Sequence, residues 1–223
     1  MRDDPRVVDR VSNRGTEVSL LEGAGPGRHF TLAYNGEAFR STNDSAASAI
    51  LAETMLGLIK SSRGIDILLG GLGLGDTLKT VLGHTGLRSV TVVEQDDIVP
   101  AWVRDHLQAG ELLDDPKTHL VIGNFAGYLE GAPESYHGIA LDLDLGPPRI
   151  LREENRRAYS LTALRNLTAR LRSDGVLVIR STEDDRAYRR ALDEMFSEVA
   201  VRTVDLENAA GHPVRTVIYV ARM

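Results

Sequence analysis

A short apolar run, a glycine-rich turn and the start of a helix follow one another between residues 65 and 82. Ile65–Leu69 has the composition of a strand that is buried on both faces. The turn that follows contains four glycines, Gly70, Gly71, Gly73 and Gly75. Glycine lets the backbone turn sharply and lets a ligand approach it closely. Because Asp76 can cap the next helix, this order predicts the opening of a nucleotide-binding βαβ unit, with the glycines and Asp76 at the nucleotide.

The second predicted strand of this unit ends in an acidic residue. Glu94 closes the β-branched run Ser89–Glu94 and lies 19 residues beyond Gly75. At about this spacing an acidic side chain reaches the ribose hydroxyls in doubly wound folds. A glycine motif alone is also typical of a tight strand-to-helix turn. The acid favours a bound nucleoside, and we expect Glu94 and the adjacent Gln95 to contact it.

The spacing of the glycines indicates which nucleoside is bound. Gly71, Gly73 and Gly75 form a GxGxG turn, whereas enzymes that seat a dinucleotide pyrophosphate use GxGxxG. A GxGxG turn followed by an acidic strand end is typical of transferases that use S-adenosylmethionine. That molecule has no phosphate, so the turn only has to pass close to its amino-acid tail and ribose. We therefore expect S-adenosylmethionine or a relative of it rather than NAD.

Composition narrows the classes of protein. The chain has 223 residues, of which 42% are apolar, which is enough for one sizeable core. A net charge of −6 argues against partners such as nucleic acid or an anionic membrane. There is no cysteine for a disulfide or a thiolate site, and no metal-ligand spacing is recognisable. Without a signal peptide or membrane-length apolar run, we expect a soluble cytoplasmic protein.

Although the chain is acidic overall, six arginines lie close together between positions 152 and 172. They are Arg152, Arg156, Arg157, Arg165, Arg170 and Arg172. These arginines have helical spacing and are interleaved with Glu153 and Glu154. We expect a solvated helix face on which they pair with acids.

The remaining patterns predict a doubly wound α/β fold. Residues 1–14 are charged without a clear period and predict a loose arm. Strands at 17–21 and 29–34, a turn at 23–27 and the Asn35-Gly36 pair predict a small β-hairpin extension. Further strands are expected at 119–122, 138–142, 176–180, 199–206 and 216–221, and helices at 46–60, 98–107, 153–172 and 182–197. These elements predict an arm and hairpin over residues 1–45, then a mostly parallel seven-stranded sheet of the class I methyltransferase type over residues 46–223.

Polar residues at the ends of the third and fourth predicted parallel strands are candidates for the site. Ligands of open α/β sheets bind outside the carboxyl ends of the strands. Asp142 and Asp144 lie at one such end, where two carboxylates can hold an amine and take its proton, or can instead cap the following loop. Asn124 and Phe125 follow the other strand and are expected to contact adenine, although Asn124 can equally hold a turn.

From about Glu17 to Arg180 the chain resembles the spermidine synthase family, which comprises the polyamine aminopropyltransferases and their relatives among the class I S-adenosylmethionine-dependent transferases. The resemblance rests on six blocks in order: Tyr34–Asp44, Gly71–Leu82, Val93–Asp96, Asp114–Pro116, Gly123–Ala126 and Leu141–Pro147. In the same order, these blocks resemble the family's hairpin, its GGGDGGTLREVL-like turn, its VEID strand end, its DDPR motif, its GDA motif and its DSSDPxGP loop. The resemblance makes a homodimer the default expectation.

The chain departs from the family at residues that serve the aminopropyl donor and the polyamine. The family's acid within the glycine turn falls on Leu74, and its hairpin glutamine falls on Phe39. The Tyr-His-Glu of its first helix falls on Ser48–Ile50. A cationic polyamine needs carboxylates and hydroxyls to replace its water, so apolar replacements would leave ammonium groups unpaired. The nucleoside half of the site therefore resembles the family, and the polyamine half does not.

Three hypotheses follow from this comparison. The first is a methyltransferase that uses intact S-adenosylmethionine and a small-molecule nitrogen or oxygen acceptor, with Asp142 positioning or deprotonating that acceptor. The second is aminopropyl transfer from decarboxylated S-adenosylmethionine to a non-standard amine, with Asp76 as the carboxylate near the donor tail. The third is a protein that binds a nucleoside without catalysis.

Overall fold

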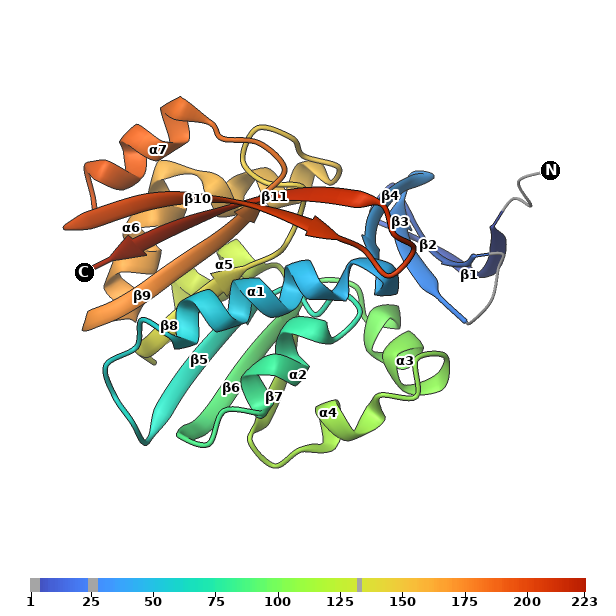
Figure 1. Ribbon diagram of the computed structural model, residues 1–223, viewed down its shortest axis with the longest axis horizontal. Helices are drawn as coiled ribbons and strands as arrows, with labels where there is room; N and C mark the ends of the chain where they lie inside the picture. The colour runs from blue at the N-terminus through green and yellow to red at the C-terminus, as the bar shows by residue number, and fades with distance from the viewer. Residues whose placement is uncertain (1–4, 24–27, 132–133) are drawn as a thin grey trace.

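The computed structural model describes residues 5–23, 28–131 and 134–223. Within these residues the chain forms two sheets (Figure 1). An N-terminal antiparallel sheet has the order β1-β2-β3-β4, with bounds Arg6–Asn13, Thr16–Glu22, Phe30–Tyr34 and Glu37–Ser41. The larger sheet has the order β10-β11-β9-β8-β5-β6-β7. Its strands are β5 Ile65–Gly70, β6 Leu87–Glu94, β7 Thr118–Ile122, β8 Tyr136–Leu141, β9 Leu171–Ser181, β10 Glu198–Glu207 and β11 Pro213–Arg222.

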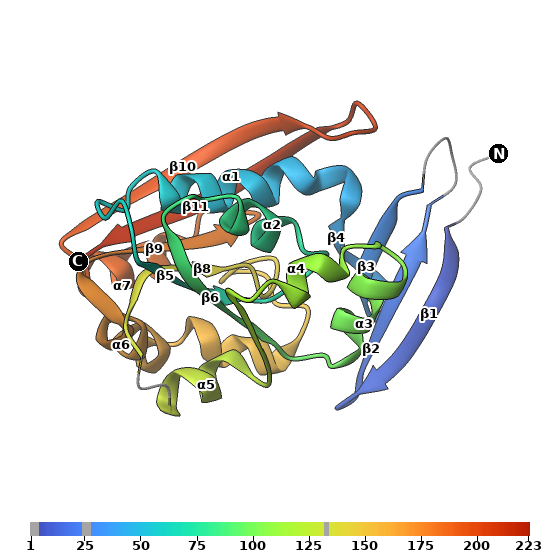
Figure 2. The same ribbon diagram turned by 90° about the horizontal axis from the view of Figure 1, so that it is seen from below.

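The larger sheet is mostly parallel and lies between two layers of helices. β5 pairs in parallel with β6 and β8, whereas β11 pairs antiparallel with β9 and β10. Two separate apolar cores flank the sheet. Figure 2 shows α1 and α2 on one side and α5, α6 and α7 on the other. The helices are α1 Ser45–Leu56, α2 Asp76–Leu82, α3 Ile98–Asp105, α4 Gly110–Asp114, α5 Phe125–Gly131, α6 Leu161–Arg170 and α7 Arg186–Asp193. This architecture confirms the predicted doubly wound fold of the class I methyltransferase type.

The N-terminal extension is larger than the sequence predicted. The Asn35-Gly36 turn is confirmed, since both residues have positive φ, 50° and 79°. The prediction of a loose arm was wrong, because β1 pairs with β2 along its length. Two long-range hydrogen bonds also hold β1: Trp102 donates to Asp9 at 2.8 Å, and Asn13 donates to Asp96 at 2.7 Å. The turn predicted at 23–27 lies mostly outside the described residues.

The long helix predicted at residues 153–172 is also wrong. Glu153–Tyr159 forms a 3₁₀ helix, and Ser160 then caps α6 by accepting from the backbone N–H of Ala163. The chain becomes extended at Leu171, where β9 already begins. Because the two helical segments are separate, the 3₁₀ helix can lie near the carboxyl end of β8, where its residue Asn155 lines the site.

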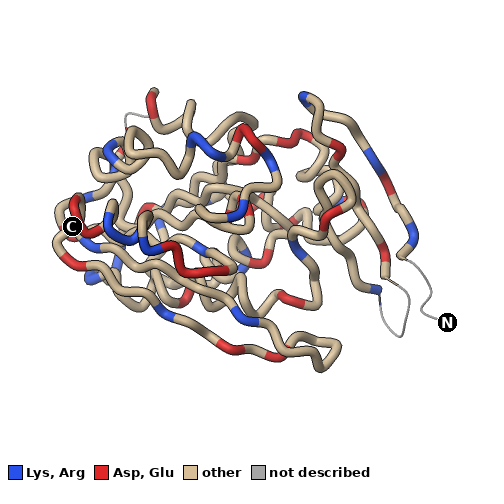
Figure 3. The backbone as a smooth tube through the Cα atoms, turned by 90° about the horizontal axis from the view of Figure 1, so that it is seen from above, with Lys and Arg blue, Asp and Glu red and all other residues tan. Residues whose placement is uncertain are grey.

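Charged residues of both signs are interspersed along the trace (Figure 3). The predicted paired face is confirmed for two arginines: Arg156 contacts Glu153 at 2.6 Å, and Arg157 contacts Glu130 at 3.2 Å. It is wrong for Arg152, whose side chain is only 1% exposed. Among the residues that the structure describes, no helix is both long and apolar enough to cross a membrane.

Candidate active site

The glycine turn packs directly against the loop that follows β8. Gly71, Gly73 and Gly75 have positive φ of 92°, 55° and 93°. A Cβ on Gly71 would lie 2.9 Å from the backbone oxygen of Asp142. A Cβ on Gly70 would lie within 3.0 Å of Leu141 and Phe125 side-chain atoms. The absence of side chains here thus brings the ends of β5 and β8 together, at the edge of the sheet where ligands of such folds bind.

We expect Gly71→Ala to lower the free energy of unfolding by about 1–3 kcal/mol, because alanine is strained at positive φ and its Cβ would press on Asp142. Urea unfolding of the purified variant measures this loss. Gly127→Ala is the matched control, since Gly127 is exposed within α5 and a Cβ there meets nothing within 4 Å. Equal stability of the two variants would contradict the described turn.

Glu94 joins the end of β6 to the glycine turn. Its side chain is buried, at 5% exposed, and its two oxygens accept from the backbone N–H groups of Leu72 and Asp96, each at 2.9 Å. Burial raises the pKa of this carboxyl, against the lowering effect of the hydrogen bonds. Glu94 therefore lies at the predicted strand end, and its oxygens are already bonded to the backbone.

Asp142 is clamped between two arginines that sequence reasoning missed. Arg40 of β4 contacts both of its carboxylate oxygens, one of them at 3.1 Å from Nε, and Arg180 of β9 approaches to 3.4 Å. Burial opposes ionisation of Asp142, but the positive charges of Arg40 and Arg180 outweigh it and lower its pKa. Burial, reinforced by the charge of Arg40, lowers the pKa of Arg180 to about 10. The carboxylate is thus held in its ionised form.

Asp144, the other predicted catalytic residue, lies in a different environment. It is fully buried, and it accepts from the backbone N–H groups of Leu145, Leu151 and Arg152 and from the Asn155 amide. These bonds occupy both of its oxygens and fold the loop after β8 upon itself. The geometry favours the structural alternative for Asp144, and a catalytic role for it stays a prediction.

The residues predicted at adenine lie beside the strand ends. The side-chain amides of Asn124 and Gln95 contact at 2.8 Å, and Asn124 also accepts from the backbone N–H of Gly127 at 3.2 Å. Asn124 thus caps α5 as well as reaching Gln95. Phe125 is 2% exposed and packs in the core beneath α5. A contact between these side chains and adenine stays a prediction.

Asp76 begins α2 and faces the same cluster of charges. Among the described residues no hydrogen bond or ion pair reaches its carboxylate. Burial raises its pKa to about 6; Lys79 and Arg180 lower it, and Asp142 raises it further. Asp76 therefore lies within electrostatic reach of both Asp142 and Arg180.

The site surrounds a cavity of about 20 Å³, which has room for about one water molecule. Five of the predicted residues line it: Gly71, Gly73, Glu94, Gln95 and Asp142. Phe39, on which the resemblance placed the family's hairpin glutamine, lines it as well. The sequence missed Tyr34, Asp96, Leu143, Arg152 and Asn155. Gly70, Gly75, Asp76, Asn124, Phe125 and Asp144 do not line it. Small-molecule sites usually measure about 300–1,000 Å³, so a nucleoside can enter only after side chains move.

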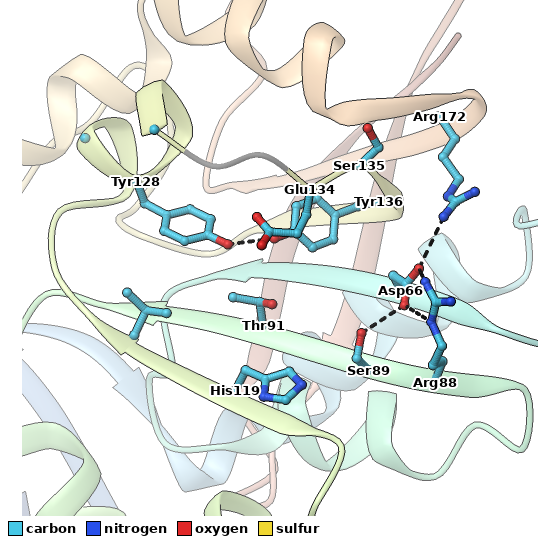
Figure 4. Close-up of a pocket in the computed structure, with 13 residues that line it drawn as sticks. Asp66, Arg88, Ser89, Thr91, His119, Tyr128, Glu134, Ser135, Tyr136 and Arg172 are labelled. Carbon is cyan, nitrogen blue, oxygen red and sulfur yellow. Dashed lines mark hydrogen bonds and ion pairs between the residues drawn. The ribbon is translucent and has the colours of Figure 1, made fainter.

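A much larger cavity, of about 990 Å³, lies at the opposite edge of the sheet (Figure 4). Four of its residues stand at the starts of strands: Asp66 in β5, Arg88 in β6, Tyr136 in β8 and Arg172 in β9. Asp66 forms ion pairs with Arg88 and Arg172, so its charge is already compensated. Ligands of open α/β sheets bind at the carboxyl ends of strands, and we place the candidate site there.

Comparison with known proteins finds relatives of this chain among the polyamine aminopropyltransferases. A polyamine aminopropyltransferase of Pseudomonas aeruginosa is 33% identical over 147 residues, which are 60% of this chain and 40% of that protein. One from Hyperthermus butylicus is 28% identical over 213 residues, covering 89% of this chain and 66% of that protein. The chain is spermidine synthase-like. A crystal structure of spermidine synthase in complex with the transition-state analogue AdoDATO shares the fold, with a TM-score of 0.80, 21% identity and coverage of 97% of this chain and 73% of that one. No family model matches the sequence.

The relatives correct the first hypothesis from the sequence. The curated relatives compared above are named polyamine aminopropyltransferases, so methyl transfer from intact S-adenosylmethionine is wrong as the main interpretation. The spermidine synthase-like chain spans 40% of the length of the Pseudomonas relative.

Proposed function

We propose that this chain transfers an aminopropyl group from decarboxylated S-adenosylmethionine to a small-molecule amine. One observation carries the proposal: Asp142 and Glu94, from the two strands that flank β5, line the same cavity beside the glycine turn. The names of the relatives support the same reaction.

Each part of the site has a role in this reaction. Glu94 offers carboxylate oxygens to the ribose, and the bare backbone at Gly71 and Gly73 lets the donor approach. When bound, the donor supplies a carbon activated by its positively charged sulfur. A bond forms between that carbon and the acceptor nitrogen, the carbon–sulfur bond breaks with its electron pair left on sulfur, and the acceptor loses one proton. Asp142, with its lowered pKa, is better suited to holding an ammonium than to taking that proton.

Donor binding requires Arg40 to move. Its guanidinium lies over the Phe39 ring at 4.0 Å and pairs with Asp142, where a substrate ammonium would otherwise lie. An arginine side chain has several rotatable bonds, so it can swing away without a change of the backbone. The donor's ammonium would then replace the Arg40 guanidinium at Asp142.

Binding of a nucleoside without catalysis is a second candidate. It is favoured by the pairing of Asp142 with two arginines, which leaves little of its charge for a substrate. Leu74 and Phe39 also favour this candidate, because they lie where the family resemblance leads us to expect polar residues.

Calorimetric titration and a product assay test the proposal. We expect decarboxylated S-adenosylmethionine to bind at least about tenfold more tightly than the intact form, whose added carboxylate, on the carbon that carries the ammonium, would lie close to Asp142. We also expect release of 5′-methylthioadenosine when an amine is supplied with the decarboxylated donor. Preference for the intact form would contradict the proposal. Tight binding with no product over a broad panel of amines would support the second candidate instead.

A further inference from the structure

A second pocket, of about 380 Å³, lies behind the glycine turn. We call it the turn pocket; the residues that line it include Arg28, Phe30, Leu74, Asp76, Lys79 and His106. Its volume falls in the range of small-molecule sites, unlike that of the cavity at Glu94. Gly73 lines the cavity at Glu94, whereas Leu74 and Asp76 line the turn pocket, so consecutive residues of the glycine turn border both spaces.

One wall of the turn pocket is already held in place. Arg28 donates to Glu22 at 3.0 Å, and its guanidinium lies 5.2 Å from the centre of the Phe30 ring. The Phe30 and His106 rings are 6.4 Å apart. The loop containing His106 is fixed by a backbone hydrogen bond to Trp102 at 3.0 Å. Because these groups are already partnered, this wall is largely preformed.

The opposite wall presents two charges of opposite sign. Asp76 and Lys79 are three residues apart on α2, so their side chains project from the same side of the helix. No ion pair joins them, and among the described residues neither side-chain charge has another partner within hydrogen-bond distance. A ligand with both an ammonium and an anionic group would satisfy both charges at once.

Asp76 also connects the turn pocket to the reaction centre. Its carboxyl is influenced by the charges of Asp142 and Arg180 as well as that of Lys79. With a pKa of about 6, raised chiefly by burial, it is better matched than Asp142 to accept a proton near neutral pH. A nitrogen held at Asp76 would therefore lie next to both a base and the donor's site.

We propose that the turn pocket binds the acceptor, and that the acceptor is a small amino acid whose amine lies at Asp76 and whose carboxylate lies at Lys79. This inference rests on the proposed function. The acceptor nitrogen forms its bond to the donor carbon as the carbon–sulfur bond breaks, and its proton passes to Asp76 and then to water. A carboxylate-bearing acceptor agrees with Leu74 and Phe39, which provide no site for the several ammonium groups of a polyamine.

Binding without the donor tests the class of acceptor. The probes are amino acids of increasing length (β-alanine, γ-aminobutyrate and 5-aminovalerate) and the diamines of matching chain length. We expect the best amino acid to bind at least about tenfold more tightly than its matched diamine, as one charged contact predicts. Lys79→Met should remove that difference, and Asp76→Asn should weaken both ligands. Lys60→Met is the control, because Lys60 is exposed and does not line the pocket. Equal binding of diamines, no binding of any probe, or no effect of Lys79→Met would overturn the inference.

A donor assay separates this inference from the proposed function. Release of 5′-methylthioadenosine with amino acids, and its loss in Lys79→Met, would support both. Release with diamines in preference to amino acids would keep the proposed function and overturn the acceptor class. If amino acids bind with the expected dependence on Lys79 but no product forms, the ligand class stands and the assignment as an acceptor falls together with the proposed function.

Discussion

Asp142→Asn is expected to lower kcat/KM for aminopropyl transfer by about 100-fold or more. The substitution removes the carboxylate that we propose holds the donor's ammonium, and loss of one partner of a buried charge pair costs about 2–5 kcal/mol in binding. Because the pKa of Asp142 is lowered, its role is in holding charge, and most of the loss should appear in the KM for the donor. Steady-state kinetics with 5′-methylthioadenosine as the measured product provide both constants.

The same substitution should lower stability, which must be separated from its effect on the reaction. Arg40 and Arg180 are 8% and 9% exposed, and without Asp142 they become buried cations that lack their partner. Breaking such a pair costs about 3–5 kcal/mol. The double variant Asp142→Asn/Arg40→Met should regain part of that stability and none of the activity. Asp174→Asn, at an exposed position, is the control for both measurements. Unchanged donor KM and kcat in Asp142→Asn would contradict the proposed role.

The parts of the site that the sequence predicted are those set by local spacing. The glycine turn and Glu94 follow from residues less than thirty positions apart, in a pattern that one βαβ unit imposes on any chain. Asp142 was placed correctly beside them because parallel strands end at the same edge of the sheet. Their predicted contacts with a nucleoside remain predictions.

The parts that the sequence missed depend on distant partners. Arg40 and Asp142 are 102 residues apart, and Arg152 and Asp96 are 56 apart, so no local pattern marks either pair. Arg180 could have been found, because it lies near the end of a predicted strand at the carboxyl edge of the sheet. β1 was missed since its residues alternate weakly and are held by β2, Trp102 and Asp96.

These long-range pairs also determine the charge of the site. Leu74 and Phe39 lie where the family resemblance leads us to expect polar residues, and the arginines Arg40, Arg152 and Arg180 supply positive charge close to the carboxylates. Because each of these arginines pairs with a carboxylate, little negative charge is left free for the several ammonium groups of a polyamine. The charge pattern therefore supports an acceptor that itself carries a negative group, as inferred for the turn pocket.

Arg152→Met is expected to lower the free energy of unfolding by about 3–5 kcal/mol. Arg152 and Asp96 are each 1% exposed and form an ion pair, and the Arg152 guanidinium also lies 5.5 Å from the centre of the Tyr34 ring. Asp96 accepts from Asn13 of β1 as well, so loss of Arg152 leaves a buried carboxylate at the junction between the N-terminal sheet and the larger one. Urea unfolding followed by circular dichroism measures the loss.

A double-mutant cycle with Asp96→Asn shows whether the loss comes from that carboxylate. If it does, the double variant Arg152→Met/Asp96→Asn will lose less free energy of unfolding than the two single variants lose together. The difference, which is the coupling energy, should exceed about 1 kcal/mol. Arg156→Met is the matched control: Arg156 also pairs with an acid, Glu153, but its side chain is 62% exposed. Its unfolding midpoint should be unchanged, because exposed pairs contribute little. Equal losses of stability in the two arginine variants would contradict the prediction, because burial of the Arg152–Asp96 pair would then not determine how much it stabilises the fold. The N-terminal sheet would in that case be held chiefly by its other contacts.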